Sequence, residues 1–305
     1  MRRPLTVVGA LSNVGASPYD DGVARDLNRA PAVLRERGLV SRLRGIDMGD
    51  VIAPSYRDYT RLPDRVRNQE QVATYSRALA QRLSCAMAHD SFGLVVGGDC
   101  SVVLGCLLAG RSRAGDQLGL IYVDAHADYA VNEESVSGAA ANMALAMATG
   151  RDRSPLATLA GATRLVDGVH TALIGRRHSS TEGWAATALA ESSILDVSSA
   201  QLLSDDRLEL AALTLDRVAG TQDSGFWIQL DVDVLNPMVM GAVEAPEAGG
   251  PTAAQLIEFL RPIVRHPQAL GMSVTTYDPA LDPDRSCARQ LVAILEALFA
   301  PSVSG

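Results

Sequence analysis

The chain alternates short, continuous apolar runs with longer segments in which apolar positions recur at helical spacing. The first pattern is typical of strands buried on both faces, and the second of helices that pack on a sheet. Their alternation predicts an α/β protein in which helices cover both faces of a mainly parallel sheet. The predicted strands are residues 5–8, 94–96, 118–123, 171–174, 226–230 and 270–274. The predicted helices are residues 30–37, 70–88, 102–108, 143–149, 208–218, 253–265 and 288–299.

No repeat or low-complexity linker divides the chain, so we expect residues 1–305 to form a single domain. The N-terminal segment MRRPLTVVGALSN weakly resembles a signal peptide, but Asn13 and Gly15 break its apolar run early. We therefore interpret it as the first strand. No apolar run reaches the roughly 18 residues of a membrane span. We expect a cytoplasmic protein without a membrane partner.

Composition excludes several kinds of function. The net charge is −8 and basic residues do not cluster, which argues against nucleic acid as a partner. All 27 basic residues are arginines, so lysine Schiff-base catalysis and a P-loop lysine are excluded. Three of the four cysteines are expected to be small core residues: Cys85, Cys106 and Cys287.

Polar residues follow three of the predicted strands directly, where ligands bind in open parallel sheets. In an extended segment alternate side chains share one side, so Asp124, His126 and Asp128 are predicted to converge on one point. Asp231 and Asp233 repeat this spacing after a second strand. A single such segment is more often a cap or a turn. Carboxylates gathered from several strand ends, however, repel one another unless cations neutralise them, and therefore indicate a metal site.

The three segments resemble the signature motifs of the arginase, agmatinase and formimidoylglutamase superfamily, the ureohydrolases. Those motifs read GGDHS, DAHxD and DxD followed by a proline. Here they read GGDCS at 97–101, DAHAD at 124–128 and DVDVLNP at 231–237, in the same order. Residues 244–250 also resemble the loop after the third motif. The resemblance covers nearly the whole chain and implies a three-layer α/β/α fold with a mainly parallel eight-stranded sheet, of the type that arginases share with deacetylase-like enzymes.

The resemblance also implies a hydrolase of linear amidines. Its members cleave a C–N bond of a small guanidine or amidine with two divalent ions, usually Mn²⁺, bridged by a hydroxide. By position in the motifs, Asp124 and Asp231 would bridge both ions, while His126 and Asp233 would complete one of them. The predicted catalytic residues are His126 and Asp128, of which Asp128 would relay a proton to the departing amine. The resemblance also implies that the chain forms a homo-oligomer, either a trimer or a hexamer.

Asp128 and Cys100 would complete the second ion, and Cys100 is the first departure from the family, which usually has a histidine there. A thiolate ligand would shift the metal preference toward Zn²⁺, Fe²⁺ or Co²⁺. The alternative is a small packed residue beside a weakened metal position. A ureohydrolase-like branch that hydrolyses N-hydroxyarginine also carries a cysteine here, so N-hydroxyguanidines belong among the expected substrates.

The substrate-binding segments depart further. Only the Ser137-Gly138 step of the arginase substrate loop is retained, and the position of its histidine falls near Ala141 or Asn142. Thr276 stands where guanidine-cleaving members have a glutamate, and a neutral hydroxyl cannot pair with a guanidinium as a carboxylate does. The predicted substrate-binding residues are Ser137, Asn142, Thr276 and Glu247.

Some alternatives remain open. Two arginines after the strand at 171–174, Arg176 and Arg177, either face inward and favour an anionic group or, more simply, face solvent. The chain could also be an arginase-fold amidohydrolase that acts on an amide, with Tyr277 stabilising an oxyanion. A third possibility is a non-catalytic member with an impaired metal site.

Overall fold

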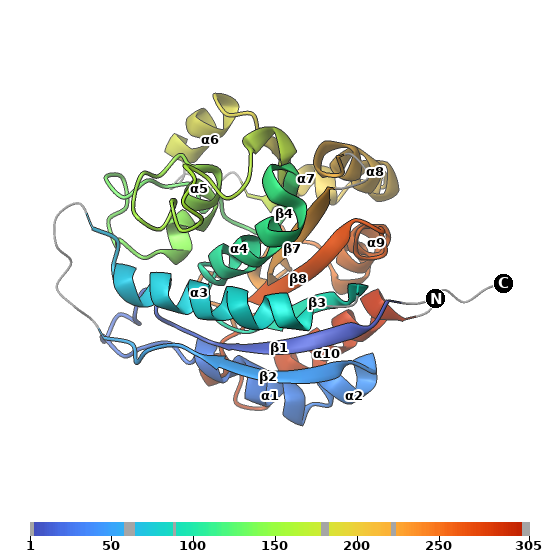
Figure 1. Ribbon diagram of the computed structural model, residues 1–305. Helices are drawn as coiled ribbons and strands as arrows, with labels where there is room; N and C mark the ends of the chain where they lie inside the picture. Colours follow the sequence, from blue (N-terminus) through green and yellow to red (C-terminus); the bar gives the residue numbers. More distant parts are fainter. Residues whose placement is uncertain (1–2, 58–64, 88–89, 178–182, 221–223, 301–305) are drawn as a thin grey trace.

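The centre of the fold is a sheet of eight strands in the order β2-β1-β3-β8-β7-β4-β5-β6. It is seen in a computed structural model that describes residues 3–57, 65–87, 90–177, 183–220 and 224–300 (Figure 1). All seven strand pairings are parallel. The strands are β1 (Leu5–Leu11), β2 (Ile46–Ile52), β3 (Phe92–Val96), β4 (Leu118–Val123), β5 (Thr171–Arg176), β6 (Leu195–Ser198), β7 (Gly225–Asp231) and β8 (Ala269–Thr275).

Helices cover both faces of this sheet, and each face has its own hydrophobic core. One core includes side chains of α3, α4, α5 and α6, and the other includes side chains of α1, α2, α8, α9 and α10. The helices are α1 (Ala30–Glu36), α2 (Leu39–Leu43), α3 (Gln69–Ala86), α4 (Val102–Ala114), α5 (Ala144–Thr149), α6 (Gly183–Ala190), α7 (Ser199–Leu202), α8 (Arg207–Val218), α9 (Ala253–Val264) and α10 (Ser286–Phe299). Within the described ranges, no helix has the length and apolar character that a bilayer span requires.

Strand β4 shows why the apolar runs become central strands. Its side chains alternate between the two cores: Leu120 and Tyr122 enter one, and Ile121 and Val123 the other. A strand between two helical layers has no solvent-facing side, so nearly every position is apolar. The three-layer fold, the mainly parallel sheet and the six predicted strands are confirmed.

The sequence interpretation missed the two edge strands and three helices. In β2 only one of seven side chains is buried, and β6 has four residues, so neither presents an apolar run. The missed helices are α2, α6 and α7. The helix predicted at 102–108 continues to Ala114, and the one predicted at 70–88 ends at Ala86. Residue 88 lies outside the described part of the chain.

The strand order brings four strand ends together. β3, β8, β7 and β4 are consecutive neighbours, although they come from distant parts of the sequence (Figure 1). The turn after β3 requires glycine, because Gly97 and Gly98 have φ angles of 94° and 82°. A Cβ atom on Gly97 would also lie 2.6 Å from Pro31. The residues that follow these four strands are therefore presented at one edge of the sheet.

Candidate metal centre

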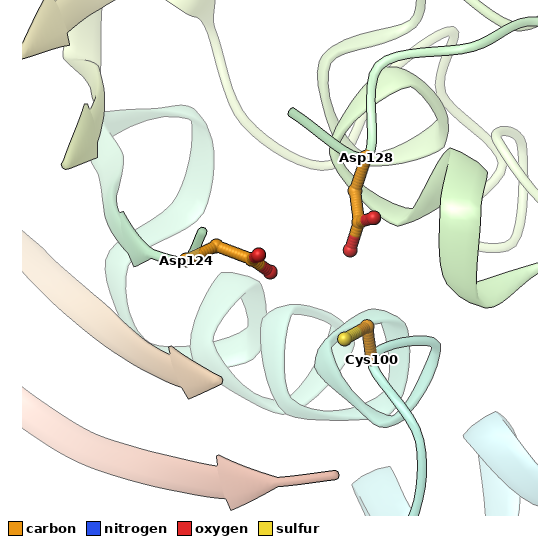
Figure 2. Close-up of side chains that lie close together, drawn as sticks. All are labelled: Cys100, Asp124 and Asp128. Atoms are coloured by element: carbon orange, nitrogen blue, oxygen red, sulfur yellow. The ribbon is translucent and has the colours of Figure 1, made fainter. Parts of the chain in front are cut away.

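The first group of possible metal ligands joins the ends of β3 and β4. Figure 2 shows Cys100, Asp124 and Asp128 with their side chains directed toward a common space. One ligand atom from each residue lies within 4.8 Å of the other two. A thiol and two carboxylates at this spacing can share one divalent ion.

A second group joins the ends of β4 and β7. It consists of Asp124, His126 and Asp233, whose ligand atoms also lie within 4.8 Å of one another. Nδ1 of His126 is 3.0 Å from Oδ2 of Asp233 and 3.6 Å from Oδ1 of Asp124. Because Asp124 belongs to both groups, the two positions are adjacent and share a carboxylate. This is the arrangement that a binuclear centre requires.

Asp231 lies beside the first group. The thiol of Cys100 donates to its Oδ2 across 2.8 Å, and the backbone N–H of Asp233 donates to its Oδ1 at the same distance. The hydroxyl of Thr276 donates to Oδ1 as well. This last contact follows from the sheet register, which pairs Asp231 with Thr275 of the neighbouring β8.

The negative charges of the clustered aspartates favour bound cations. Burial and the charges of Asp233, Asp128 and Asp231 raise the pKa of Asp124 well above its usual range. Burial and the charge of Asp233 do the same for the pKa of Asp231. Oδ2 of Asp124 is buried and has no hydrogen-bond partner among the described residues. A buried carboxylate oxygen without a partner is destabilising, and a bound divalent ion would both complete it and remove the repulsion.

The protonation of Cys100 and His126 reflects the same negative charge. Burial and the charges of Asp231, Asp128 and Asp124 raise the pKa of the Cys100 thiol. Burial alone would lower the pKa of His126, but its hydrogen bonds to Asp124 and Asp233 raise it. Both residues therefore hold protons in the absence of an ion. A bound cation would displace these protons, because metals bind thiolate and neutral imidazole.

Asp124, His126 and Asp128 do not converge on one point, and that prediction is wrong. The segment after β4 is not extended, and Asp128 has a φ angle of 45°. This left-handed turn directs Asp128 to the first group, whereas His126 belongs to the second. Beneath the centre, the hydroxyl of Tyr122 donates to Oδ2 of Asp128 across 2.6 Å. The fully buried Tyr122 thus fixes one oxygen of a candidate ligand, a contact that the sequence interpretation missed.

The centre forms the floor of a cavity of about 440 Å³. All six predicted ligands line this cavity, as do three of the four predicted substrate-binding residues: Ser137, Asn142 and Thr276. Glu247 is not part of the lining, but its Oε2 is 3.9 Å from Nε2 of His126. The remaining lining residues, which the sequence interpretation did not assign, are Asp99, Ala130, Glu134, Ser135, Val136, Ala141, Glu244 and Ala245.

Apart from Asp99, which lies in the turn after β3, the unassigned lining residues come from two loops, and the sequence offered only a weak signal for them. One loop follows the second motif and the other follows the third. Loop positions have no periodicity that would show which side chains point inward. Glu134 and Glu244 are ionisable residues in loops that follow metal motifs, and this could have singled them out.

Neither expectation for Arg176 and Arg177 is correct. Both are buried rather than solvent-facing, and neither lines the cavity. Arg176 forms an ion pair with Asp196 at 2.6 Å. Arg177 donates to the backbone oxygens of Val234 and Leu235 and so supports the loop after β7. Both arginines therefore have structural partners within the fold, and neither is available to a substrate in the cavity.

Two other expectations need correction. Cys85 is exposed on α3 and Cys287 is half-buried, so only Cys106 of the three is a core residue. Tyr277 is buried outside the cavity lining, and its hydroxyl donates to Asp282 across 2.7 Å. It therefore does not provide the oxyanion donor that an amidohydrolase mechanism would require.

Comparisons with known proteins agree with the geometry. The family model described as the Arginase family matches residues 18–300. The arginase of Bacillus caldovelox is 27% identical to this chain, over 97% of the chain and 98% of its own length. A solved structure of that arginase has a TM-score of 0.86 at 24% identity, covering 99% of this chain and 100% of its own. The formimidoylglutamase structure from Bacillus subtilis has a TM-score of 0.73 at 17% identity, covering 98% and 86%.

Proposed function

The chain belongs to the arginase family of hydrolases, and from this premise we propose that it cleaves a C–N bond of a guanidine, N-hydroxyguanidine or amidine-type small molecule. The observation that carries the proposal is the pair of ligand groups that share Asp124 on the floor of one cavity. A single group could hold a structural ion, whereas two adjacent groups open to a cavity support metal-assisted hydrolysis.

We assign the two ions as the motifs suggest. Asp124 and Asp231 would contact both ions, with His126 and Asp233 completing one and Asp128 and Cys100 the other. When bound, the ions supply Lewis acidity and lower the pKa of water toward neutrality. We propose Mn²⁺ as the metal, and the thiol at Cys100 keeps Zn²⁺, Fe²⁺ and Co²⁺ as alternatives.

The chain's own residues supply orientation and proton transfer. Tyr122 donates to Oδ2 of Asp128 and so orients this carboxylate, which lines the cavity beside the candidate ligands. Asp128 is therefore the residue that would accept a proton and pass it to the departing nitrogen. His126, which also lines the cavity, is the second proposed catalytic residue.

The hydroxyl of Thr276 indicates that the reacting group of the substrate is not strongly cationic. Its hydroxyl is already committed to Asp231, and it cannot supply the paired charge-assisted hydrogen bonds of a carboxylate. We therefore expect L-arginine and agmatine to be turned over roughly 10²-fold or more below the best substrate of the enzyme. Assays of both compounds beside N-hydroxyguanidines test this, and efficient arginine turnover would contradict the assignment of Thr276.

The proposal as a whole is tested by metal content and product. Purified protein should carry about two equivalents of a divalent metal and release urea or a substituted urea from a guanidine-type substrate. Release of a carboxylic acid from an amide, without urea, would favour the amidohydrolase alternative. Protein that binds fewer than one equivalent and cleaves neither class would be a non-catalytic member. Sedimentation would test the proposed trimer or hexamer.

A further inference from the structure

Glu244 is an acidic side chain of the cavity wall that the metal centre does not use. It lies in the loop after β7 and lines the cavity that opens over the two ligand groups. Its side chain retains 27% of its exposure, so it is half-buried yet accessible from the cavity. The charges of Asp233 and His126 act on the pKa of Glu244, so its carboxyl group lies within electrostatic range of the metal centre. A group on a substrate that reaches the metals would pass near this carboxylate.

Only one oxygen of Glu244 has a partner in the described structure. Oε1 forms an ion pair with Arg25 at 3.2 Å, whereas no described residue makes a hydrogen bond or ion pair with Oε2. Arg25 is held in place, because its Nε donates to the backbone of Ser17 and its guanidinium stacks on the ring of Tyr19. Arg25 is not part of the cavity lining. The pair therefore fixes the carboxylate from behind and leaves its second oxygen for a ligand.

The surroundings of Glu244 favour a cation. Burial raises the pKa of Glu244 to about 7, although the charge of Arg25 opposes the shift. A carboxylate that burial destabilises gains more from a new positive partner than an exposed one does. The hydroxyl of Tyr56, which lies within electrostatic range of Glu244, is buried without a hydrogen-bond partner among the described residues. Near Glu244, the described residues therefore do not supply hydrogen-bond partners for every buried polar group.

Glu134, the other glutamate of the cavity lining, differs from Glu244. Both of its oxygens bind Arg151, at 2.9 Å each, and Oε2 also accepts the backbone N–H of Val131. The charge of Glu134 is thus neutralised by Arg151, which follows α5. Asp99, which also lines the cavity, accepts backbone N–H groups on both oxygens, from Gly15 and Ser101. Among the described lining carboxylates outside the metal centre, Glu244 is therefore the one with an oxygen available to a ligand.

We propose that Glu244 binds a protonated amine at the far end of the substrate and so selects its class. Resting on the proposed function, this inference describes a substrate with a weakly basic C–N group at the metals and a cationic tail. Thr276, beside Asp231, lacks the carboxylate that would pair with a cationic group at the metals. In this proposal Glu244, in the loop after β7, supplies a carboxylate for a different part of the substrate.

The test compares two probes of equal length that differ in one charge. N-(4-aminobutyl)-N′-hydroxyguanidine carries an ammonium where N-pentyl-N′-hydroxyguanidine carries a methyl group. Calorimetry of the Mn²⁺-loaded protein should show that the wild type binds the amine probe roughly 10- to 100-fold more tightly, the range expected for a hydrogen bond between charged groups. Glu244→Gln should reduce this preference to about twofold or less, because the amide keeps the shape and loses the charge.

Glu258→Gln is the matched control. Glu258 is also paired with an arginine, Arg207 at 2.7 Å, but it lies on α9 outside the cavity lining. This variant should keep the wild-type preference. The inference is overturned if the wild type binds both probes equally or binds neither, or if Glu244→Gln keeps the preference. Because the wild-type result alone can overturn it, the test does not depend on the folding of a variant.

Product analysis separates this inference from the proposed function. If Glu244→Gln loses the preference while the wild type releases no urea-type product from either probe, Glu244 is a cation-binding residue and the hydrolase assignment fails. If product forms and the preference is unchanged in Glu244→Gln, the assignment stands and the role of Glu244 fails.

Discussion

The floor and the rim of the cavity are built differently. The floor consists of the six candidate ligands, nearly all buried and held by strand ends and by hydrogen bonds from Tyr122, Thr276 and the backbone. The rim consists of cavity-lining residues from two loops, between Ala130 and Asn142 and at Glu244 and Ala245, and Val136 in the first loop is 97% exposed. The sheet determines the floor and therefore the kind of reaction, whereas the loops determine the rim and therefore the substrate. Changes to the floor should affect metal binding and catalysis, and changes to the rim should affect selectivity.

Replacement of Asp124 should have the largest effect. Asp124→Asn removes the carboxylate that both ligand groups share. Because a metal ion contributes several kcal/mol to the stability of the transition state, we expect activity to fall by about 10³-fold or more, with loss of bound metal. Elemental analysis and a urea assay measure both. An active variant that retains two metals would show that Asp124 is not shared.

Replacement of Cys100 should affect one of the two metal positions on the floor and leave the other intact. Cys100→Ala should lose one metal and keep the other, because His126 and Asp233 belong to the other group. Activity should fall roughly 10²-fold. Cys100→His should restore two metals and favour Mn²⁺, since imidazole and carboxylates suit this ion better than sulfur does. If the wild type and both variants carry the same metals in equal amounts, Cys100 is a packed residue that does not bind metal.

Removal of the Tyr122 hydroxyl should have a smaller effect on the floor. Tyr122→Phe leaves Oδ2 of Asp128 without its donor. Hydrogen-bonding partners of metal ligands typically contribute about 10- to 100-fold to metal affinity or activity. Titration of metal into chelated protein measures the affinity. The control is Tyr75→Phe, which removes the hydroxyl of a buried tyrosine on α3 that donates to the backbone oxygen of Val51 across 3.4 Å. Equal behaviour of the two variants would rule out a positioning role for Tyr122.

The rim should show the smallest effect. Ser137 is half-buried, and its hydroxyl accepts the N–H of Ala139 in addition to lining the cavity. Ser137→Ala should raise KM about 3- to 10-fold and leave kcat nearly unchanged, as expected for a single neutral hydrogen bond to the substrate. Metal content should remain that of the wild type. A loss of metal in Ser137→Ala would contradict the assignment of metal binding to the floor and of selectivity to the rim.

The sequence predicted the centre of the fold better than its edges. A strand such as β4 faces apolar helices on both sides, so its composition alone identifies it. β2 places Asp47 and Asp50 at its exposed positions, where both bind Arg35 of α1. An edge strand stabilised by tertiary ion pairs has no apolar pattern to detect.

The candidate site divides in the same way. Ligands at strand ends could be placed together because the carboxyl ends of parallel strands meet at one edge. Residue spacing alone could not separate His126 from Asp128, because their separation depends on the φ angle of a single residue. Only the family resemblance assigned these two residues to different ions. The burial of Arg177 depends on carbonyl oxygens near residue 234, far away in the sequence. Local pattern carries no information about such partners.

The position of β8 has a consequence for how the protein is made. This strand is the last of the eight in the sequence, yet it lies between β3 and β7 in the sheet. A chain emerging from the ribosome can pair β4 with β7 and so bring Asp124, His126 and Asp233 together before β8 exists. Cys100 and Asp231 acquire their final spacing only when β8 fills the gap of roughly 10 Å between the flanking strands. If strands pair in the order in which they are synthesised, the ligands of the histidine-containing group can therefore come together before those of the cysteine-containing group.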